Sequence, residues 1–250
     1  MTYCLAIQLD EGLVFCSDSR TNAGADRVST YSKMHRFAVQ GDRSLILLTA
    51  GNLATSQAVV SQIQRDLQEN SEFNISDAKY VSDIADYIGQ LNVAEQEKHR
   101  RPGGPDAEGF NASASFILGG QVKGQPSELY LIYPEGNHIT ASEQHPYLQI
   151  GETKYGKPIL DRIIQPDTSP EIAMRCGLLS IDSTMRSVHL MRGRRLWPGL
   201  KENPAPTSCG TWASLPSPAS VVPMASTPIV MAATSNRLGS LSCRTRTSAG

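Results

Sequence analysis

A chain of 250 residues with 40% hydrophobic and 19% charged residues is long enough for one large domain with a sizeable core. A formal net charge of −1 provides no basic excess for nucleic acid or an anionic membrane surface, and no apolar run approaches the roughly 18 residues of a membrane span. No charged-then-apolar leader precedes the first predicted strand, so we expect a cytoplasmic protein that binds neither nucleic acid nor membrane.

The amino terminus carries the first chemical signal. Met1 precedes Thr2, and an initiator methionine is normally removed before a residue as small as threonine. Thr2 would then carry both a hydroxyl and a free α-amino group. Because an α-amine titrates near about pH 8, it can accept a proton at neutral pH, and a threonine activated by its own terminal amine is a known type of nucleophile. Thr2 is therefore a candidate nucleophile.

A β-hairpin is predicted directly after this residue. Two apolar runs, Tyr3–Leu9 and Leu13–Ser17, flank a short turn in which Gly12 can take a positive φ. Asp18 ends the second strand, so the hairpin would return its carboxyl group toward the amino-terminal end of the first. The polar segment 20–32 is predicted to be a loop.

Lys33 leads into a second predicted hairpin, with strands at Met34–Gln40 and Ser44–Ala50 around a turn at 41–43. Two hairpins in succession favour one antiparallel sheet. Gly51 ends the last strand, and a helical pattern begins immediately after it.

Two amphipathic helices follow, each with apolar residues on one stripe. The stripe of the first helix comprises Leu53, Val60, Ile63 and Leu67. The second helix is predicted to begin near Asp77, which would serve as its N-cap. Its stripe comprises Val81, Ile84, Ile88 and Leu91. A charged loop with Pro and Gly at 101–105 follows.

The second half repeats the order of strands and then helices. Strands are predicted at 112–118 and 128–133, joined through Gly119, Gly120 and Gly124, and then after a turn at 134–137 and at 147–150. One helix begins near Lys157, and another begins near 168–171 and is expected to end close to Asp182. Runs of strands followed by runs of helices favour layered α+β packing over alternating βαβ units.

The composition changes after about residue 191. Seven of the 15 prolines fall within 192–250, and Glu202 is the only acidic residue there. Such a segment cannot bury enough apolar surface to offset chain entropy. We therefore divide the chain into a domain at 1–191 and an atypical Pro/Ser/Arg-rich tail at 192–250, which we expect to be disordered or derived from a frameshift near 187–193.

Three further residues suit the chemistry of an amino-terminal threonine. Lys33 beside Thr2 would disfavour a second positive charge and lower the pKa of the terminal amine. Asp18 would pair with Lys33 and hold it in place. Gly51, at a strand-to-helix junction, would let a substrate carbonyl approach a backbone N–H that stabilises an oxyanion. The alternative interpretation of Asp18 and Lys33 is an ordinary surface ion pair.

Other possible sites have weaker support. Residues 151–157 match the first seven positions of a P-loop, but Pro158 replaces the hydroxyl residue that would hold Mg²⁺. The five histidines and five cysteines show no metal-ligand spacing. We expect no cofactor and no metal, and we expect the cysteines to be buried, reduced thiols.

Several stretches resemble the bacterial proteasome-related family called Anbu, which is similar to proteasome β subunits. They are SDSRTNAG at 17–24, KMH at 33–35, TAGNLATSQAV at 49–59, GETKYGKPILDR at 151–162 and SIDSTMRS at 180–187. The similarity runs over roughly residues 1–188. It implies an N-terminal nucleophile hydrolase fold, of the α+β class, in which two antiparallel sheets are flanked by helix pairs as a four-layer αββα sandwich. It also implies that copies of the chain assemble into a homo-oligomeric ring or open spiral.

The resemblance implies catalytic roles for five residues. Thr2 would be the nucleophile, with Asp18 and Lys33 as its electrostatic partners. The Gly51 N–H would lie in the oxyanion hole, and Asp182 would stand near the terminal amine.

Further roles follow from the same resemblance. Ser183 or Ser187 would accompany the acidic residue near the terminal amine. Arg20, Thr49 and Leu53 would line the pocket for the substrate residue that precedes the cut.

These features together predict a threonine-type endopeptidase subunit that hydrolyses peptide bonds through an acyl-enzyme. Peptides or unfolded proteins would be its substrates, and an ATPase partner is left open. Two alternatives are a structural ring or scaffold subunit with weak or absent catalysis, and a non-peptide amidohydrolase of the same fold.

Overall fold

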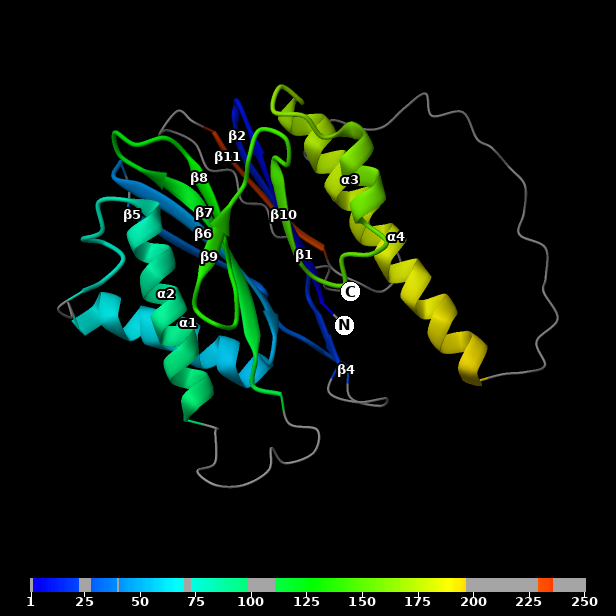
Figure 1. Ribbon diagram of the computed structural model, residues 1–250, viewed down its shortest axis with the longest axis horizontal. Coiled ribbons are helices and arrows are strands. Elements are labelled where there is room, and N and C mark those ends of the chain that lie inside the picture. Colours follow the sequence, from blue (N-terminus) through cyan, green and yellow to red (C-terminus); the bar gives the residue numbers. More distant parts are fainter. Residues whose placement is uncertain are drawn as a thin grey trace, which may run out of the picture.

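The computed structural model describes residues 2–22, 28–39, 41–69, 73–98, 111–196 and 229–235. These residues form two main antiparallel sheets, which lie face to face with a pair of helices on the outer side of each (Figure 1). The predicted four-layer αββα sandwich of the α+β class is therefore confirmed.

The first sheet contains the amino-terminal hairpin. Its strands are β1 (Tyr3–Leu9), β2 (Gly12–Asp18), β10 (Tyr147–Gly151) and β11 (Ile229–Ser235). They lie in the order β10-β1-β2-β11, and all neighbours are antiparallel. Gly12 has a φ of +149°, so the prediction of a positive φ at this turn is confirmed.

The second sheet contains the second hairpin. Its strands are β5 (Met34–Val39), β6 (Arg43–Gly51), β7 (Ala114–Val122), β8 (Glu128–Ile132) and β9 (His138–Thr140), in that order. The expectation that both hairpins share one sheet is wrong. All seven residues of β2 and most of β6 are buried, because these two strands lie in different sheets that cover each other face to face, instead of in one sheet extended edge to edge.

Two loop predictions also change. The segment 20–32 contains a short two-stranded ladder of β3 (Arg20–Asn22) and β4 (Val28–Thr30), whose polar residues give no alternating apolar pattern. Gly119 and Gly120 lie inside β7, and the turn to β8 is at Gly124, which has a φ of +80°. The two strand glycines are needed for packing, since a Cβ on Gly119 would lie 2.7 Å from the Phe15 ring.

Four helices cover the sheets in the described part of the chain. They are α1 (Leu53–Glu69), α2 (Val81–Glu97), α3 (Lys157–Ile163) and α4 (Pro170–Leu196). The predicted cap at Asp77 is wrong, because α2 begins four residues later. Tyr80 is its N-cap residue, and the Asp83 carboxylate accepts a hydrogen bond from the Tyr80 amide at 3.2 Å.

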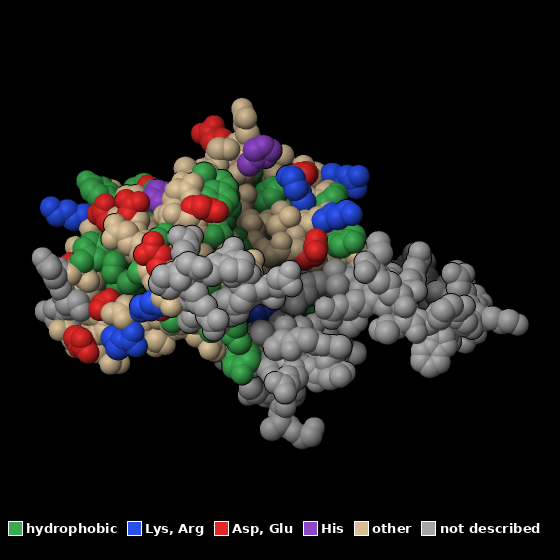
Figure 2. Space-filling model, turned by 60° about the horizontal axis from the view of Figure 1, so that its bottom comes forward, with side chains coloured by type: hydrophobic (Ala, Val, Ile, Leu, Met, Phe, Trp, Pro, Cys, Tyr) green, Lys and Arg blue, Asp and Glu red, His purple; other side chains and the backbone are tan. Residues whose placement is uncertain are grey.

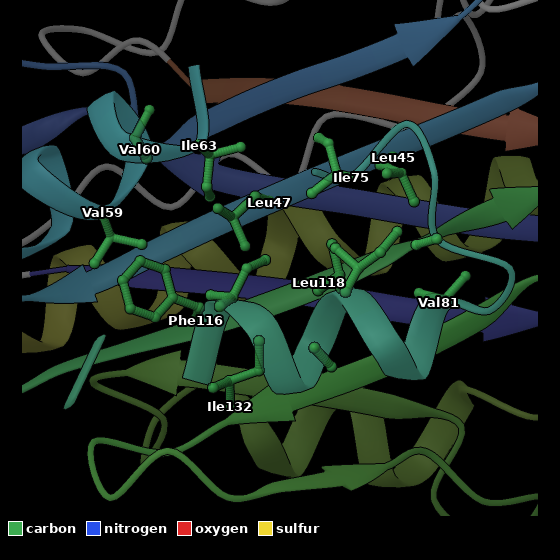
Figure 3. Packing of buried hydrophobic residues seen from close by; sticks show 14 of the residues in the cluster. Leu45, Leu47, Val59, Val60, Ile63, Ile75, Val81, Phe116, Leu118 and Ile132 are labelled. Carbon is green, nitrogen blue, oxygen red and sulfur yellow. The ribbon is translucent and has the colours of Figure 1, made fainter. Parts of the chain in front are cut away.

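The apolar interior is divided among three interfaces between layers. Between the two sheets lie residues such as Cys4, Phe15 and Ile117, and between the first sheet and the helices α3 and α4 lie Tyr3 and Leu160. The third cluster packs α1 and α2 on the second sheet. Figure 3 shows its side chains, including Leu47, Ile63, Val81, Phe116 and Ile132. Successive residues of β1 alternate between two of these clusters, as side chains of a strand must.

The end of the chain departs from prediction. Helix α4 does not end near Asp182 but continues to Leu196. Within the tail expected to be disordered, Ile229–Ser235 forms strand β11 and pairs with β2 along its whole length. The other residues after 196 lie outside the described part of the chain, as does the loop at 101–105.

The cysteines and the surface agree with an ordinary folded domain. Cys4, Cys16 and Cys176 are buried free thiols, as predicted, whereas Cys209 and Cys243 lie outside the described residues. Among the described helices, none has the length and apolar character needed to cross a membrane. On the face drawn in Figure 2, acidic and basic side chains of the described residues are interspersed.

Candidate active site

The first and second strands bring Asp18 to the amino terminus. In the β1–β2 ladder, Cys4 lies opposite Ser17, so the next pair along the hairpin joins Tyr3 to Asp18. The Tyr3 amide donates a hydrogen bond to Asp18 Oδ1 at 2.9 Å. The hairpin therefore returns its last carboxylate to the residue that follows Thr2, as its turn predicted.

Lys33 completes a buried ion pair at this position. Its Nζ donates to both oxygens of the Asp18 carboxylate, at 2.8 and 3.0 Å. Lys33 is 4% exposed and Asp18 is 5% exposed, so the alternative of an ordinary surface pair is wrong. The Thr49 amide donates to the Lys33 carbonyl at 2.9 Å, which ties the start of β5 to β6. Because both charges are buried, each depends on the other for compensation.

The backbone of Thr2 is hydrogen-bonded to the segment that follows β10, on the side away from Asp18. Its carbonyl accepts a hydrogen bond from the Glu152 amide at 2.8 Å. Gly151 has a φ of +89°, and a Cβ there would overlap the Thr2 carbonyl oxygen. The turn after β10 can therefore approach the amino terminus only because it begins with glycine. The carbonyl of Thr2 and the amide of Tyr3 belong to one peptide group, which is thus fixed at both ends.

Gly51 lies at the predicted junction of strand and helix. It has a φ of +102°, and a Cβ would lie 2.5 Å from the Ser113 carbonyl oxygen. Asn52 follows, and its amide donates to the same carbonyl at 2.9 Å. The Asn52 side-chain oxygen accepts hydrogen bonds from the amides of Ala54 and Thr55, at 3.0 and 3.2 Å, and so caps α1.

The residues expected to line a substrate pocket lie on three different elements. Thr49 is buried on β6, and its carbonyl accepts a hydrogen bond from the Cys4 thiol at 3.7 Å. Leu53 is the first residue of α1, and Arg20 is the first residue of β3. The side chain of Arg20 lies outside the described part of the structure.

Asp182, predicted to stand near the terminal amine, has its ion-pair partner on its own helix. It lies within α4 and forms an ion pair with Arg186 at 2.9 Å, one turn further along the helix. The Ser183 hydroxyl donates to the Tyr155 carbonyl at 3.3 Å. Among the described residues, the hydrogen bonds of these two side chains do not reach Thr2. Ser187 is half-buried one turn beyond Ser183.

Two features near the amino terminus were missed by sequence reasoning. The first is the Glu152 amide, and the second is a buried hydrogen-bonded group of Tyr3, Gln149 and Ser180. A tyrosine in a largely apolar strand is the signal that could have found the second, because a buried phenol requires a hydrogen-bond partner. The first involves only backbone atoms and leaves no side-chain signature.

The protonation of Cys4 matters because its thiol lies close to this site. Burial raises the pKa of Cys4, and the Asp18 charge raises it further. A protonated thiol is a poor nucleophile. The buried Cys4 thiol therefore stays protonated at neutral pH and is a poor candidate nucleophile.

The P-loop-like segment has a structural use. Gly151 packs on the Thr2 carbonyl, and a Cβ on Gly156 would collide with the hydroxyl oxygens of Tyr3 and Ser180. Its glycines thus allow close packing around the amino terminus.

Comparison with known proteins extends these observations. The model of the family described as "Proteasome subunit" matches residues 2–193. No curated protein matches the chain. Among solved structures, Anbu (ancestral beta-subunit) from Yersinia bercovieri is 42% identical, with coverage of 74% of this chain and 76% of that chain and a TM-score of 0.68.

Two further solved structures are similar. One is a helical assembly of the Anbu complex from Pseudomonas aeruginosa, which is 44% identical, covers 74% of this chain and 75% of that chain, and has a TM-score of 0.69. Anbu from Hyphomicrobium sp. strain MC1 is 33% identical, covers 96% of this chain and 85% of that chain, and has a TM-score of 0.72.

Proposed function

The chain belongs to the proteasome subunit family, with Anbu proteins among its relatives, and on this premise we propose that it is a threonine-type peptidase subunit whose nucleophile is Thr2. Its family and fold are those of an N-terminal nucleophile hydrolase. The observation that carries the proposal is the Asp18 carboxylate, which accepts hydrogen bonds from both the Tyr3 amide and the Lys33 ammonium group. Because one carboxylate binds both groups, it supports a position for the buried Lys33 near Thr2, which would be the amino terminus once Met1 is removed.

The proposed reaction uses both functional groups of Thr2. Its hydroxyl oxygen attacks the scissile carbonyl, and its own α-amine accepts the hydroxyl proton and then delivers it to the leaving amine. The Lys33 ammonium disfavours a second positive charge nearby, which keeps the α-amine in its basic form. The Gly51 N–H donates to the oxyanion of the tetrahedral intermediate. Water then attacks the acyl-enzyme and regenerates Thr2.

Three residues form the proposed binding site for the substrate residue before the cut. Thr49 and Leu53 flank Gly51 on the β6–α1 junction, and Arg20 follows Asp18 by two positions. Asp182 remains a candidate for a supporting role near the α-amine, although its ion pair with Arg186 favours a role within α4.

Self-association is part of the proposal. The Anbu complex from Pseudomonas aeruginosa is described as a helical assembly, and we propose that copies of this chain also assemble, as a ring or open spiral in the cytoplasm. Peptides or unfolded proteins are the proposed substrates. A scaffold subunit with vestigial chemistry and a non-peptide amidohydrolase are the competing functions.

Peptide hydrolysis by assembled protein with a verified amino terminus tests the proposal. Thr2→Ala removes the hydroxyl and is expected to abolish turnover, whereas Thr2→Ser retains hydroxyl and amine and is expected to keep measurable turnover. Protein that has lost Met1 and assembled, yet cleaves no member of a fluorogenic peptide panel, would support the scaffold. Cleavage of small amides alone would support the amidohydrolase.

A further inference from the structure

Tyr3 has a hydroxyl that no step of the proposed reaction uses. The residue is completely buried, and its Oη lies 2.5 Å from Ser180 Oγ on α4. The Gln149 side chain of β10 donates a hydrogen bond to the same phenol oxygen. Since the phenol accepts from Gln149, it can donate its own proton to Ser180. A fully satisfied buried phenol therefore joins three separate elements of the fold.

This hydrogen-bonded group, Tyr3 with Gln149 and Ser180, fits tightly against α3. Gly156 is the N-cap residue of α3, and a Cβ there would collide with both the Tyr3 and Ser180 hydroxyl oxygens. Ser180 is itself completely buried on α4. Phenylalanine would fill the same apolar volume as Tyr3, so hydrophobic packing alone does not account for a phenol at this position.

The same segment also holds Thr2. Gln149 lies just before Gly151 and Glu152. Gly151 packs closely on the Thr2 carbonyl, and the Glu152 amide donates a hydrogen bond to it. On the other side of the same peptide group, the Tyr3 amide is bonded to Asp18. The peptide group between Thr2 and Tyr3 connects Thr2 to the buried Asp18–Lys33 pair. The Tyr3 side chain thus anchors this peptide group to β10 and α4.

We infer that Tyr3 is a positioning residue, whose hydroxyl sets the placement of Thr2 relative to Lys33 through Gln149 and Ser180. This inference rests on the proposed function. Loss of the phenol would leave the chain folded and Thr2 present, but would allow the peptide group after Thr2 to shift. Misplacement of a nucleophile lowers the rate of the chemical step much more than it weakens substrate binding.

The test compares Tyr3→Phe with the wild type as assembled protein whose Met1 removal is verified by intact mass. We expect kcat to fall by about 10- to 100-fold with KM within about two-fold of wild type. We also expect the Glu152 amide to exchange hydrogen at least about five-fold faster, observed in a peptide spanning 148–156. Ser180→Ala removes the other partner and is expected to change both quantities in the same direction, by a smaller factor.

Tyr87→Phe is the matched control. It also removes a phenol that hydrogen-bonds a side chain, the half-buried Asp66, but in the α1–α2 layer. This variant is expected to leave kcat and the Glu152 exchange rate unchanged. Wild-type kcat or wild-type Glu152 exchange in both Tyr3→Phe and Ser180→Ala overturns the inference. Wild-type protein without peptidase activity overturns the proposed function instead, and the exchange rates then decide alone whether Tyr3 holds Thr2.

Discussion

At the scale of single residues, the Asp18 carboxylate joins the first strand to Lys33. It is 5% exposed and hydrogen-bonded to a backbone amide as well as to an ammonium group. Removal of one member of a buried ion pair leaves the other charge uncompensated. A single substitution of Asp18 or Lys33 should therefore lower both the stability and the activity. A double substitution should distinguish the effect on stability from the effect on activity.

Lys33→Met is expected to lower peptidase activity at least about 100-fold and stability by about 3–5 kcal/mol, because Asp18 is left buried and unpaired. Arg175→Met is the control, since Arg175 forms an exposed pair with Glu171, and it should change stability by less than about 1 kcal/mol. Denaturant unfolding and peptide hydrolysis measure the two effects. The double variant Asp18→Asn/Lys33→Met should recover part of the stability and none of the activity; recovery of activity would contradict the assigned role.

Tyr3 gives a prediction at alkaline pH. Burial raises the pKa of Tyr3 from 10.0 to about 12. The folded state therefore retains the phenol proton where the unfolded chain loses it, so this contribution to stability is complete below about pH 10 and is lost as the pH rises toward about 12. The stability difference between wild type and Tyr3→Phe should shrink by about 2–3 kcal/mol across this window. A difference that stays constant from pH 9 to 12 would contradict the burial of the phenol.

At the scale of elements, the junction between β6 and α1 presents the Gly51 amide. Its positive φ and the nearby Ser113 carbonyl both require glycine. The sequence predicted this junction well, because the end of an apolar strand and the start of a helical stripe are local patterns. The contacts of Asn52 with the carbonyls of Asn111 and Ser113 could not be predicted, since these residues lie just before β7, at least 59 positions further along the chain.

Gly51→Ala is expected to reduce both stability, by about 1–3 kcal/mol, and peptide hydrolysis, because the substitution combines an unfavourable φ with a steric clash. Gly41→Ala is the matched control. Gly41 has a φ of +76° but no neighbour within 4 Å of a Cβ, so this variant should lose about 1 kcal/mol and keep its activity. Equal activity in the two variants would exclude Gly51 from the oxyanion site.

At the scale of the whole molecule, two face-to-face sheets create the site where the ends of β1, β2 and β6 meet. Composition and element order predicted the layers, and the resemblance to the Anbu family supplied their arrangement. The local pattern could not assign the two hairpins to different sheets, because fully buried strands show no polar face that distinguishes one partner from another. Strand β11 was missed because its local sequence, seven residues in a Pro- and Ser-rich tail, does not indicate a strand. These residues are a strand because they pair with β2.

Truncation tests whether β11 supports the first sheet. Removal of residues 229–250 deletes β11 and leaves β2 as an open edge, whereas removal of 236–250 spares the strand. The longer deletion is expected to lower Tm by at least about 5 °C, at roughly 2–4 °C per kcal/mol, and to promote aggregation through the exposed edge. The shorter deletion should preserve Tm. Equal melting temperatures and equal solubility would show that β2 does not depend on β11.

The central claim is that one residue supplies both the nucleophile and its base, and a peptide epoxyketone tests it most directly. The threonine hydroxyl adds to the ketone and the α-amine opens the epoxide, so a stable ring forms only when one residue carries both groups. Mass spectrometry of assembled protein lacking Met1 is predicted to find one inhibitor per chain, bound covalently at Thr2, and none in Thr2→Ala. Unmodified Thr2 after prolonged incubation of such protein would contradict the account.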